Sequence, residues 1–110
     1  MSFFVQKTLV DQYVVISRFG KMEGEQFEVR LRAGGEWLAF LNFRHPAAQP
    51  IANHRNAQGV VELFAPPAQY LGVIDLLRHE RPVWLTLYDD PLQGWLSTGP
   101  EPAGGGEDDR

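Results

Sequence analysis

The chain has 110 residues, which is room for one domain, and 31 of them are Leu, Ile, Val or Phe, enough to build a hydrophobic core. It contains no cysteine, which excludes disulfide bonds, thiolate metal sites and thiol redox chemistry. The formal net charge of −4 arises mainly in residues 100–110, which sum to −3, so the bulk charge argues neither for nor against an anionic partner.

The sequence does not predict a membrane protein. The N-terminal residues lack the basic start and the sustained apolar stretch of a secretory signal. The most apolar segment, residues 37–43, is far too short to cross a bilayer. We therefore expect a cytoplasmic protein without a membrane partner.

Residues 3–19 are typical of β-structure. The run Tyr13-Val14-Val15-Ile16 contains the strongest β-formers, and Gly20 ends the segment. Asp11-Gln12 is the point at which the segment could divide. The sequence therefore allows either one bent strand or two.

A β-hairpin is predicted next. Apolar residues alternate with charged ones over residues 27–32, which indicates a half-buried strand. Gly34 and Gly35 supply the positive φ angles of a two-residue turn. Residues 36–44 then form the returning strand.

A long loop is predicted over residues 45–59, which contain two prolines, two asparagines and two histidines without periodicity. Loops of that length inside a compact domain are commonly functional or disordered, and the sequence leaves the order of this one open. If a neighbouring face binds an anion, the loop, with Arg44 at its base, would supply a lid. Residues 60–64 predict a short strand.

One helix and a second hairpin follow. Pro66-Pro67 opens a segment whose apolar residues recur at helical spacing, which predicts an amphipathic helix ending near Arg81-Pro82. Residues 83–88 and 95–98 predict two strands joined through the turn-forming residues 89–94.

This order of elements predicts a mainly β (α+β) domain over residues 1–99. We expect a small antiparallel β-barrel or rolled sheet of roughly five or six strands with one helix before the last hairpin, as in the element order of an OB barrel. The similarity concerns element order alone, without a family motif, so it says little about function. Residues 100–110 have the Pro, Gly and acid content of a disordered acidic tail.

The glycine turn sets the register of the first hairpin, because opposite residues of an antiparallel pair share a face. The predicted core face pairs Leu31 with Leu38, Val29 with Phe40 and Phe27 with Asn42. The predicted outer face pairs Arg32 with Trp37, Arg30 with Ala39 and Glu28 with Leu41. Extended across the preceding turn, this pattern places Val14 and Ile16 on the core face and Tyr13, Val15 and Ser17 on the outer face.

The outer face of the first hairpin is a candidate binding surface. It places Tyr13, Arg32 and Trp37 in one row, with Arg30 beside them and Arg44 at the base of the loop. Alternating aromatic and cationic side chains are typical of proteins that bind single-stranded nucleic acid. The alternative is an ordinary cross-strand pair in which Arg32 packs over Trp37 and shields its ring.

The second hairpin predicts an aromatic surface. A four-residue loop, Asp90–Gln93, places Leu87 opposite Leu96 in the core. It leaves Tyr88 opposite Trp95 outside, with Trp84 on the same face. Three large aromatic side chains exceed what scattered surface residues explain, so the predicted helix, another chain or a ligand should cover them.

No catalytic constellation is recognisable. His45, His54 and His79 include no pair at the i, i+4 spacing of a helical metal site, and Asp89-Asp90 is a turn-forming pair. The sequence contains no nucleophile elbow, phosphate-binding glycine loop or dinucleotide glycine pattern. We therefore predict no catalytic residue, no metal and no cofactor.

The sequence thus predicts a small non-catalytic binding module. Its expected partner is another protein or a second copy of the chain, as in a homodimer, met through the aromatic surface. The alternative is an OB-like protein that binds single-stranded nucleic acid through the row on the first hairpin and Arg44. A second alternative is a small-ligand carrier or an enzyme with an unrecognised site.

Overall fold

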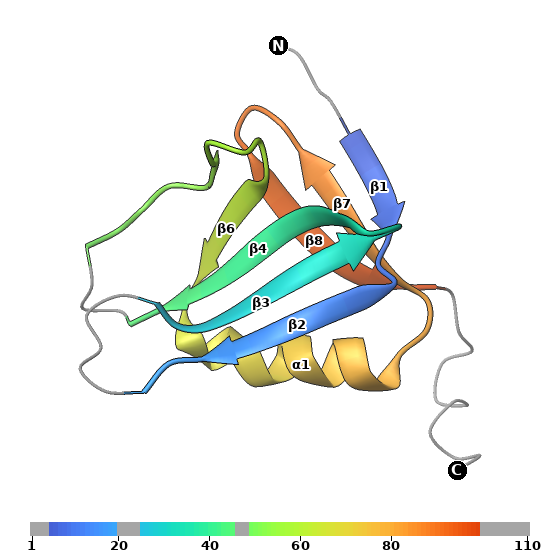
Figure 1. Cartoon of the computed structure of the whole chain (residues 1–110), viewed down its shortest axis with the longest axis horizontal. Helices are drawn as coiled ribbons and strands as arrows, with labels where there is room; N and C mark the ends of the chain where they lie inside the picture. Colours follow the sequence, from blue (N-terminus) through green and yellow to red (C-terminus); the bar gives the residue numbers. More distant parts are fainter. Residues whose placement is uncertain (1–4, 20–24, 46–48, 100–110) are drawn as a thin grey trace.

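The computed structural model describes residues 5–19, 25–45 and 49–99 and arranges their strands in two β-sheets (Figure 1). The three-stranded sheet has the order β1 (Val5–Leu9), β7 (Val83–Tyr88), β8 (Gln93–Thr98). The five-stranded sheet has the order β2 (Gln12–Ser17), β3 (Glu25–Ala33), β4 (Glu36–Arg44), β6 (Val61–Ala65), β5 (His54–Arg55). A short 3-10 helix, η1 (Pro67–Gln69), leads into the helix α1 (Tyr70–His79).

The prediction of a mainly β domain with one α-helix is confirmed over the described residues. The predicted barrel and OB-like order are not found, because the two sheets remain separate and the five-stranded sheet has two edges, β2 and β5. The chain crosses between the sheets at Val10 and Asp11, which divides the predicted first segment into two strands. Oδ2 of Asp11 accepts a hydrogen bond from Gly34 N at 2.8 Å and so ties the crossing to the β3–β4 turn. The predicted tail, residues 100–110, lies outside the described residues.

The long connection after β4 is a crossover. β6 pairs with β4 in parallel, which differs from the predicted antiparallel sheet. Because two parallel neighbouring strands run in the same direction, the chain must return from the end of β4 to the end of the sheet at which β4 begins before it enters β6. This return explains the length of the predicted loop, residues 45–59. β5 lies within the connection and pairs with β6. Asn56 shapes the turn between them, since its Oδ1 accepts hydrogen bonds from Gln58 N (2.9 Å) and Val60 N (3.0 Å).

The β3–β4 hairpin begins as predicted and then changes register. Gly34 and Gly35 have φ angles of +58° and +81°, and Arg32 pairs with Trp37. Leu38 is then an extra residue in β4, so Leu31 pairs with Ala39 and the later residues of β4 exchange faces relative to the prediction. The buried core face of the hairpin carries Val29, Leu31, Ala39, Leu41 and Phe43. The predicted core residues Phe40 and Asn42 lie on the outer face instead, paired with Arg30 and Glu28.

The two faces of β2 are also the reverse of the prediction. Tyr13 pairs with Leu31, and Val15 pairs with Val29, so both lie on the core side of the sheet. Val14 and Ile16 lie on the outer side. The prediction was wrong because the long turn between β2 and β3 does not set a register, and a slip of one residue exchanges the faces of a strand.

The hydrophobic core lies between the two sheets and α1. Its buried side chains come from both sheets: Val29, Leu31, Ala39, Leu41, Phe43, Val61, Leu63, Leu85 and Leu87. α1 packs against them with Tyr70, Val73, Ile74 and Leu77, the spacing that predicted the helix. The Tyr70 ring stacks on Phe27, with ring centroids 4.2 Å apart. No helix within the described ranges is long and apolar enough to cross a membrane.

The second hairpin keeps its predicted faces although its pairing is shifted. The turn is Asp89–Leu92, and Leu96 pairs with Leu85 rather than with Leu87. Trp95 correspondingly pairs with Thr86 rather than with Tyr88. The shift amounts to two residues, and because side chains alternate with a period of two, each remains on its predicted side.

Gly94 brings β8 close to β6. A Cβ atom at this position would lie 2.6 Å from Leu63 Cδ1 and 3.1 Å from Leu87 Cδ2. The absence of a side chain therefore lets β8, an edge of the three-stranded sheet, approach β6 of the other sheet.

Candidate functional site

The outer side of the five-stranded sheet carries two arginine–aromatic pairs, which we call the arginine surface (Arg30, Arg32, Trp37 and Phe40). The Arg30 guanidinium lies 4.5 Å from the centroid of the Phe40 ring, and that of Arg32 lies 4.7 Å from the Trp37 ring. The two rings meet edge to face, with centroids 5.6 Å apart. The guanidinium groups thus cover part of each ring, as in the alternative interpretation of the Arg32–Trp37 pair, and 38% of the Trp37 surface stays exposed.

The hydrogen-bond donors of the arginine surface are partly used by its own neighbours. Glu28 is buried, with 4% of its surface exposed, and its carboxylate accepts hydrogen bonds from Arg18 Nη2 at 2.7 Å and Arg30 Nε at 2.5 Å. Nη2 of Arg32 donates to Gly35 O at 3.0 Å, and its buried Nε has no hydrogen-bond partner among the described residues. The two arginines therefore present fewer free donors to a phosphate than the sequence suggests.

Two residues of the predicted row lie elsewhere. Tyr13 is on the core side of β2, so the sheet separates it from Arg32 and Trp37. Arg44 is at the far end of β4 from Trp37, roughly 20 Å away at about 3.3 Å per residue, and its Nη2 donates to Gln49 O at 2.8 Å. The structure thus brings together only Arg30, Arg32 and Trp37 of the five predicted residues.

The outer side of the three-stranded sheet carries the predicted aromatic surface, defined here by Trp84, Tyr88 and Trp95. The Tyr88 and Trp95 rings are 4.8 Å apart between centroids, and 57% of the Trp95 surface is exposed. Nζ of Lys7 lies 5.0 Å from the Trp84 ring centroid. Leu9, which pairs with Trp84, is exposed on the same side.

The helix does not cover this aromatic surface. The apolar side chains of α1 pack against the buried cluster that contains Leu85 and Leu87, whose side chains alternate with those of Trp84 and Tyr88 along β7. α1 therefore lies on the inner side of the three-stranded sheet. The sequence predicts that the helix, another chain or a ligand covers these aromatic side chains. Since the helix does not, another chain and a ligand remain.

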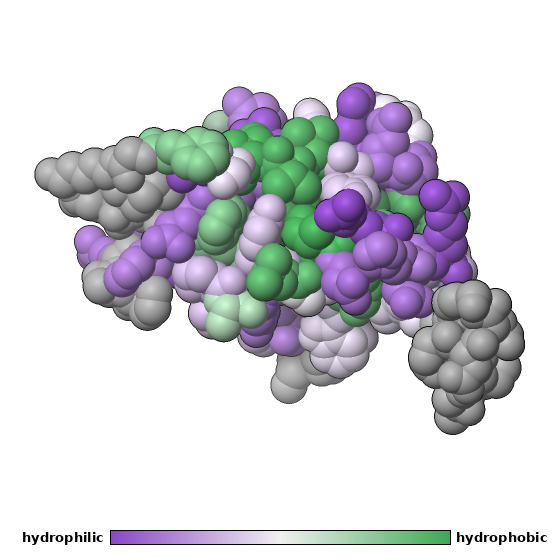
Figure 2. All heavy atoms as spheres, turned by 90° about the horizontal axis from the view of Figure 1, so that it is seen from below, coloured by the Kyte–Doolittle hydropathy of each residue, from purple (hydrophilic) through white to green (hydrophobic). Residues whose placement is uncertain are grey.

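A second apolar area lies on the helix-bearing side of the molecule, where Figure 2 shows apolar side chains gathered across it. Leu71 of α1 is 75% exposed, and Val15, on the side of β2 that faces the core, is 40% exposed. β2 is an edge strand, and none of its residues is charged. Sequence reasoning missed this edge, although the uncharged run Tyr13-Val14-Val15-Ile16 is a signal for a strand without protection against pairing.

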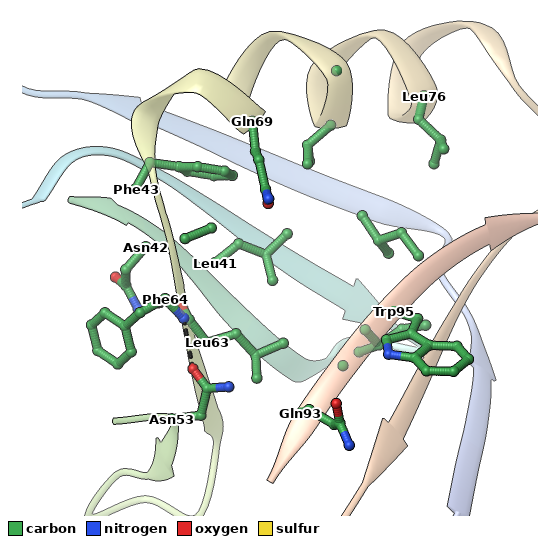
Figure 3. A pocket seen from close by; sticks show the side chains of 16 residues that line it. Leu41, Asn42, Phe43, Asn53, Leu63, Phe64, Gln69, Leu76, Gln93 and Trp95 are labelled. Atoms are coloured by element: carbon green, nitrogen blue, oxygen red, sulfur yellow. Dashed lines mark hydrogen bonds between the residues drawn. The ribbon is translucent and has the colours of Figure 1, made fainter. Parts of the chain in front are cut away.

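A cleft of about 480 Å³ opens between α1 and the neighbouring parts of β6 and β8 (Figure 3). Its walls are mostly apolar and include Leu41, Phe43, Leu63, Val73, Leu76 and Leu96. Gln69, Gln93 and Trp95 lie around it as drawn in Figure 3. Sequence reasoning could not find this cleft, because its walls come from segments far apart in the chain.

The histidines make local contacts. The His54 ring stacks on Phe64 at 5.7 Å between centroids, and its Nδ1 lies 2.9 Å from Ala52 O. Nε2 of His79 lies 3.6 Å from Asp75 Oδ1 one helical turn away. Over the ranges that the structure describes, no three His, Cys, Asp or Glu side chains are grouped so that they could hold a metal ion.

Comparisons with protein-family models, with curated proteins and with solved structures found no match to this chain.

Proposed function

We propose that the protein is a non-catalytic binding module that self-associates through its aromatic surface. The observation that carries the proposal is the grouping of Trp84, Tyr88 and Trp95 on the outer side of the three-stranded sheet, where, among the described residues, Trp95 is 57% exposed and the other two are half-buried. Soluble domains rarely leave such rings together at the surface unless a partner covers them, and aromatic side chains are enriched in protein interfaces.

A second copy is the partner that the charges favour. The outward side chains of β7 and β8 are Trp84, Thr86, Tyr88, Gln93, Trp95 and Ser97, and none of them is charged. In a two-fold dimer the same patch meets itself, so any charge at its centre would face an identical charge. The outward side chains of β7 and β8 avoid that repulsion, so the Tyr88 and Trp95 rings can pack against their copies. The one cation placed beside them by the described strands, Lys7 of β1, lies against the Trp84 ring.

The test is the mass of the protein measured by light scattering on a size-exclusion column. We expect the wild type to elute as a dimer and the variant Trp84→Thr/Tyr88→Thr to elute as a monomer, because Thr suits a strand but removes the rings. Far-UV circular dichroism checks that the variant retains its strands.

Val15→Lys is the matched control. It adds a charge to the exposed edge strand β2, outside the aromatic surface, and we expect it to leave the dimer intact. A wild-type monomer at high protein concentration would overturn the proposal. Loss of the dimer in Val15→Lys but not in the aromatic variant would also overturn it, since the contact would then run through β2.

A further inference from the structure

The cleft beneath α1 shares Trp95 but neither Trp84 nor Tyr88 with the aromatic surface, and its shape is that of a small-molecule site. Its volume of about 480 Å³ falls within the range of roughly 300–1,000 Å³ that is usual for ligand pockets. Helix and both sheets contribute walls, represented by Val73, Leu63 and Leu96. A concave, three-sided site encloses a compact molecule better than it accepts the flat surface of a folded protein.

The lining of the cleft selects for a neutral ligand. None of the residues that line it is charged. Burying an ionised group there would remove it from water without an opposite charge, which is costly. An uncharged, mainly apolar molecule meets no such penalty.

One amide at the cleft is free to orient such a molecule. The side chain of Gln69 lines the cleft and makes no hydrogen bond within the described part of the chain. Figure 3 shows Gln69 reaching from the start of the helix into the cleft. By contrast, the Asn53 amide is already used, because its Oδ1 accepts from Phe64 N at 2.9 Å and its Nδ2 donates to Leu92 O at 3.0 Å.

Gly72 leaves the helix side of the cleft without a side chain. A Cβ atom at this position would have no heavy atom within 4 Å beyond its own helix, so close packing does not require glycine. Glycine inside a helix destabilises it by about 1 kcal/mol relative to alanine. Gly72 therefore lowers the stability of the helix while it keeps the cleft open. Such a loss of stability is common at positions where a binding site requires the space.

From these observations we infer that the cleft binds a neutral, mainly apolar small molecule with one polar uncharged group, which hydrogen-bonds to Gln69. Trp95 at the rim of the cleft adds an aromatic surface against which a ring of the ligand can pack. The cleft shares Trp95 with the aromatic surface, but neither Trp84 nor Tyr88 lines it, so variants at those two residues test self-association separately.

Two dyes with the same ring system test the charge preference. N-phenyl-1-naphthylamine is neutral, and 1-anilinonaphthalene-8-sulfonate adds a sulfonate; both fluoresce more strongly in apolar surroundings. We expect saturable one-to-one binding of the neutral dye and at least about tenfold weaker binding of the anionic dye, a difference of about 1.4 kcal/mol. Equal binding of both dyes, or no saturable binding of the neutral dye, would overturn the inference.

Filling the cleft tests the location. Gly72→Leu places a side chain in the empty space, and we expect it to weaken binding of the neutral dye at least tenfold. Gly72→Met, with a more flexible side chain, is the second variant should leucine disturb the helix. Leu71→Ala is the matched control, because Leu71 is the neighbouring residue, is mostly exposed and does not line the cleft.

The variants also separate this inference from the proposed function. We expect Gly72→Leu to remain a dimer without binding the dye, and Trp84→Thr/Tyr88→Thr to bind the dye as a monomer. Unchanged dye binding in both folded Gly72 variants would overturn the cleft as the site. If Trp84→Thr/Tyr88→Thr lost dye binding while the Gly72 variants kept it, the dye would bind at the dimer contact. That result would also overturn the inference that the cleft is the site.

Discussion

The outer surfaces of the two sheets both carry aromatic rings, but the groups around the rings differ. On the five-stranded sheet, Phe40 and Trp37 each lie under a guanidinium, and Glu28 accepts two charged hydrogen bonds beside them. On the three-stranded sheet, Tyr88 and Trp95 contact each other, and Trp95 is largely exposed. On the first surface part of the arginine donors are hydrogen-bonded and both rings lie against guanidinium groups, whereas on the second the Trp95 ring is largely exposed.

The comparison shows how the same residue types produce different surfaces. Alternating Arg and aromatic residues on adjacent strands pair with each other, which reduces their availability to a partner. On β7 and β8 the aromatic residues are accompanied by Thr, Ser and Gln, and among the described residues Lys7 of β1 lies against Trp84 while Trp95 stays largely exposed. We therefore expect changes on the arginine surface to affect stability and changes on the aromatic surface to affect association.

The largest effect is expected at Glu28. Glu28→Ala leaves Arg18 and Arg30 without their carboxylate at a buried position, and we expect the free energy of unfolding to fall by about 2–3 kcal/mol. This expected loss of unfolding free energy lies at the lower end of the range for buried ion pairs, because both arginines are partly exposed. Urea denaturation measures the change. Glu36→Ala, at an exposed position in the same hairpin, is the control, and equal effects of both variants would contradict the prediction.

A smaller effect is expected for single cation–ring contacts. A double-mutant cycle of Arg30→Met and Phe40→Leu should give a coupling of about 0.5–1 kcal/mol, since the guanidinium is partly buried. The corresponding cycle of Lys7→Met and Trp84→Leu should give less than about 0.5 kcal/mol, because Lys7 is exposed. Thermal unfolding of the seven proteins, the wild type being common to both cycles, measures both couplings. A larger coupling on the three-stranded sheet would reverse the comparison.

The smallest effect is expected for nucleic acid. Glu28 and Gly35 already accept hydrogen bonds from Arg30 and Arg32, so we expect no change in the anisotropy of a labelled mixed-sequence single-stranded oligonucleotide on addition of the protein. The measurement is made at about 50 and 200 mM salt, because phosphate contacts weaken steeply over that range. A salt-sensitive complex that Arg30→Glu/Arg32→Glu abolishes would contradict the prediction and favour the nucleic acid alternative.

The candidate surfaces differ in how far the sequence predicts them. The faces of Trp84, Tyr88 and Trp95 follow from simple alternation, which survives the two-residue shift in pairing. The arginine surface is predicted only in part, because Tyr13 lies on the other side of its strand. The cleft is not predictable from the sequence, since Gly72 and Gly94 come to face one space only after α1 and β8 have packed.

The sequence by itself determined the local elements of this protein. The positive φ angles of Gly34 and Gly35, the bounds of β4 and β7, and the helix after Pro66 follow from interactions among residues close in the chain. Turn geometry and the spacing of apolar side chains suffice for these, because both act over one or two turns of structure.

Only the tertiary structure decided which side of a strand is buried and how the strands are ordered. Residues 37–43 are apolar at nearly every position, so alternation allows either face of β4 to form the core. The bulge at Leu38 selects the face on which Leu41 lies beside Leu63 and Phe43 meets the Tyr70 ring. These contacts join segments more than twenty residues apart, and their free energy depends on packing that no single segment contains.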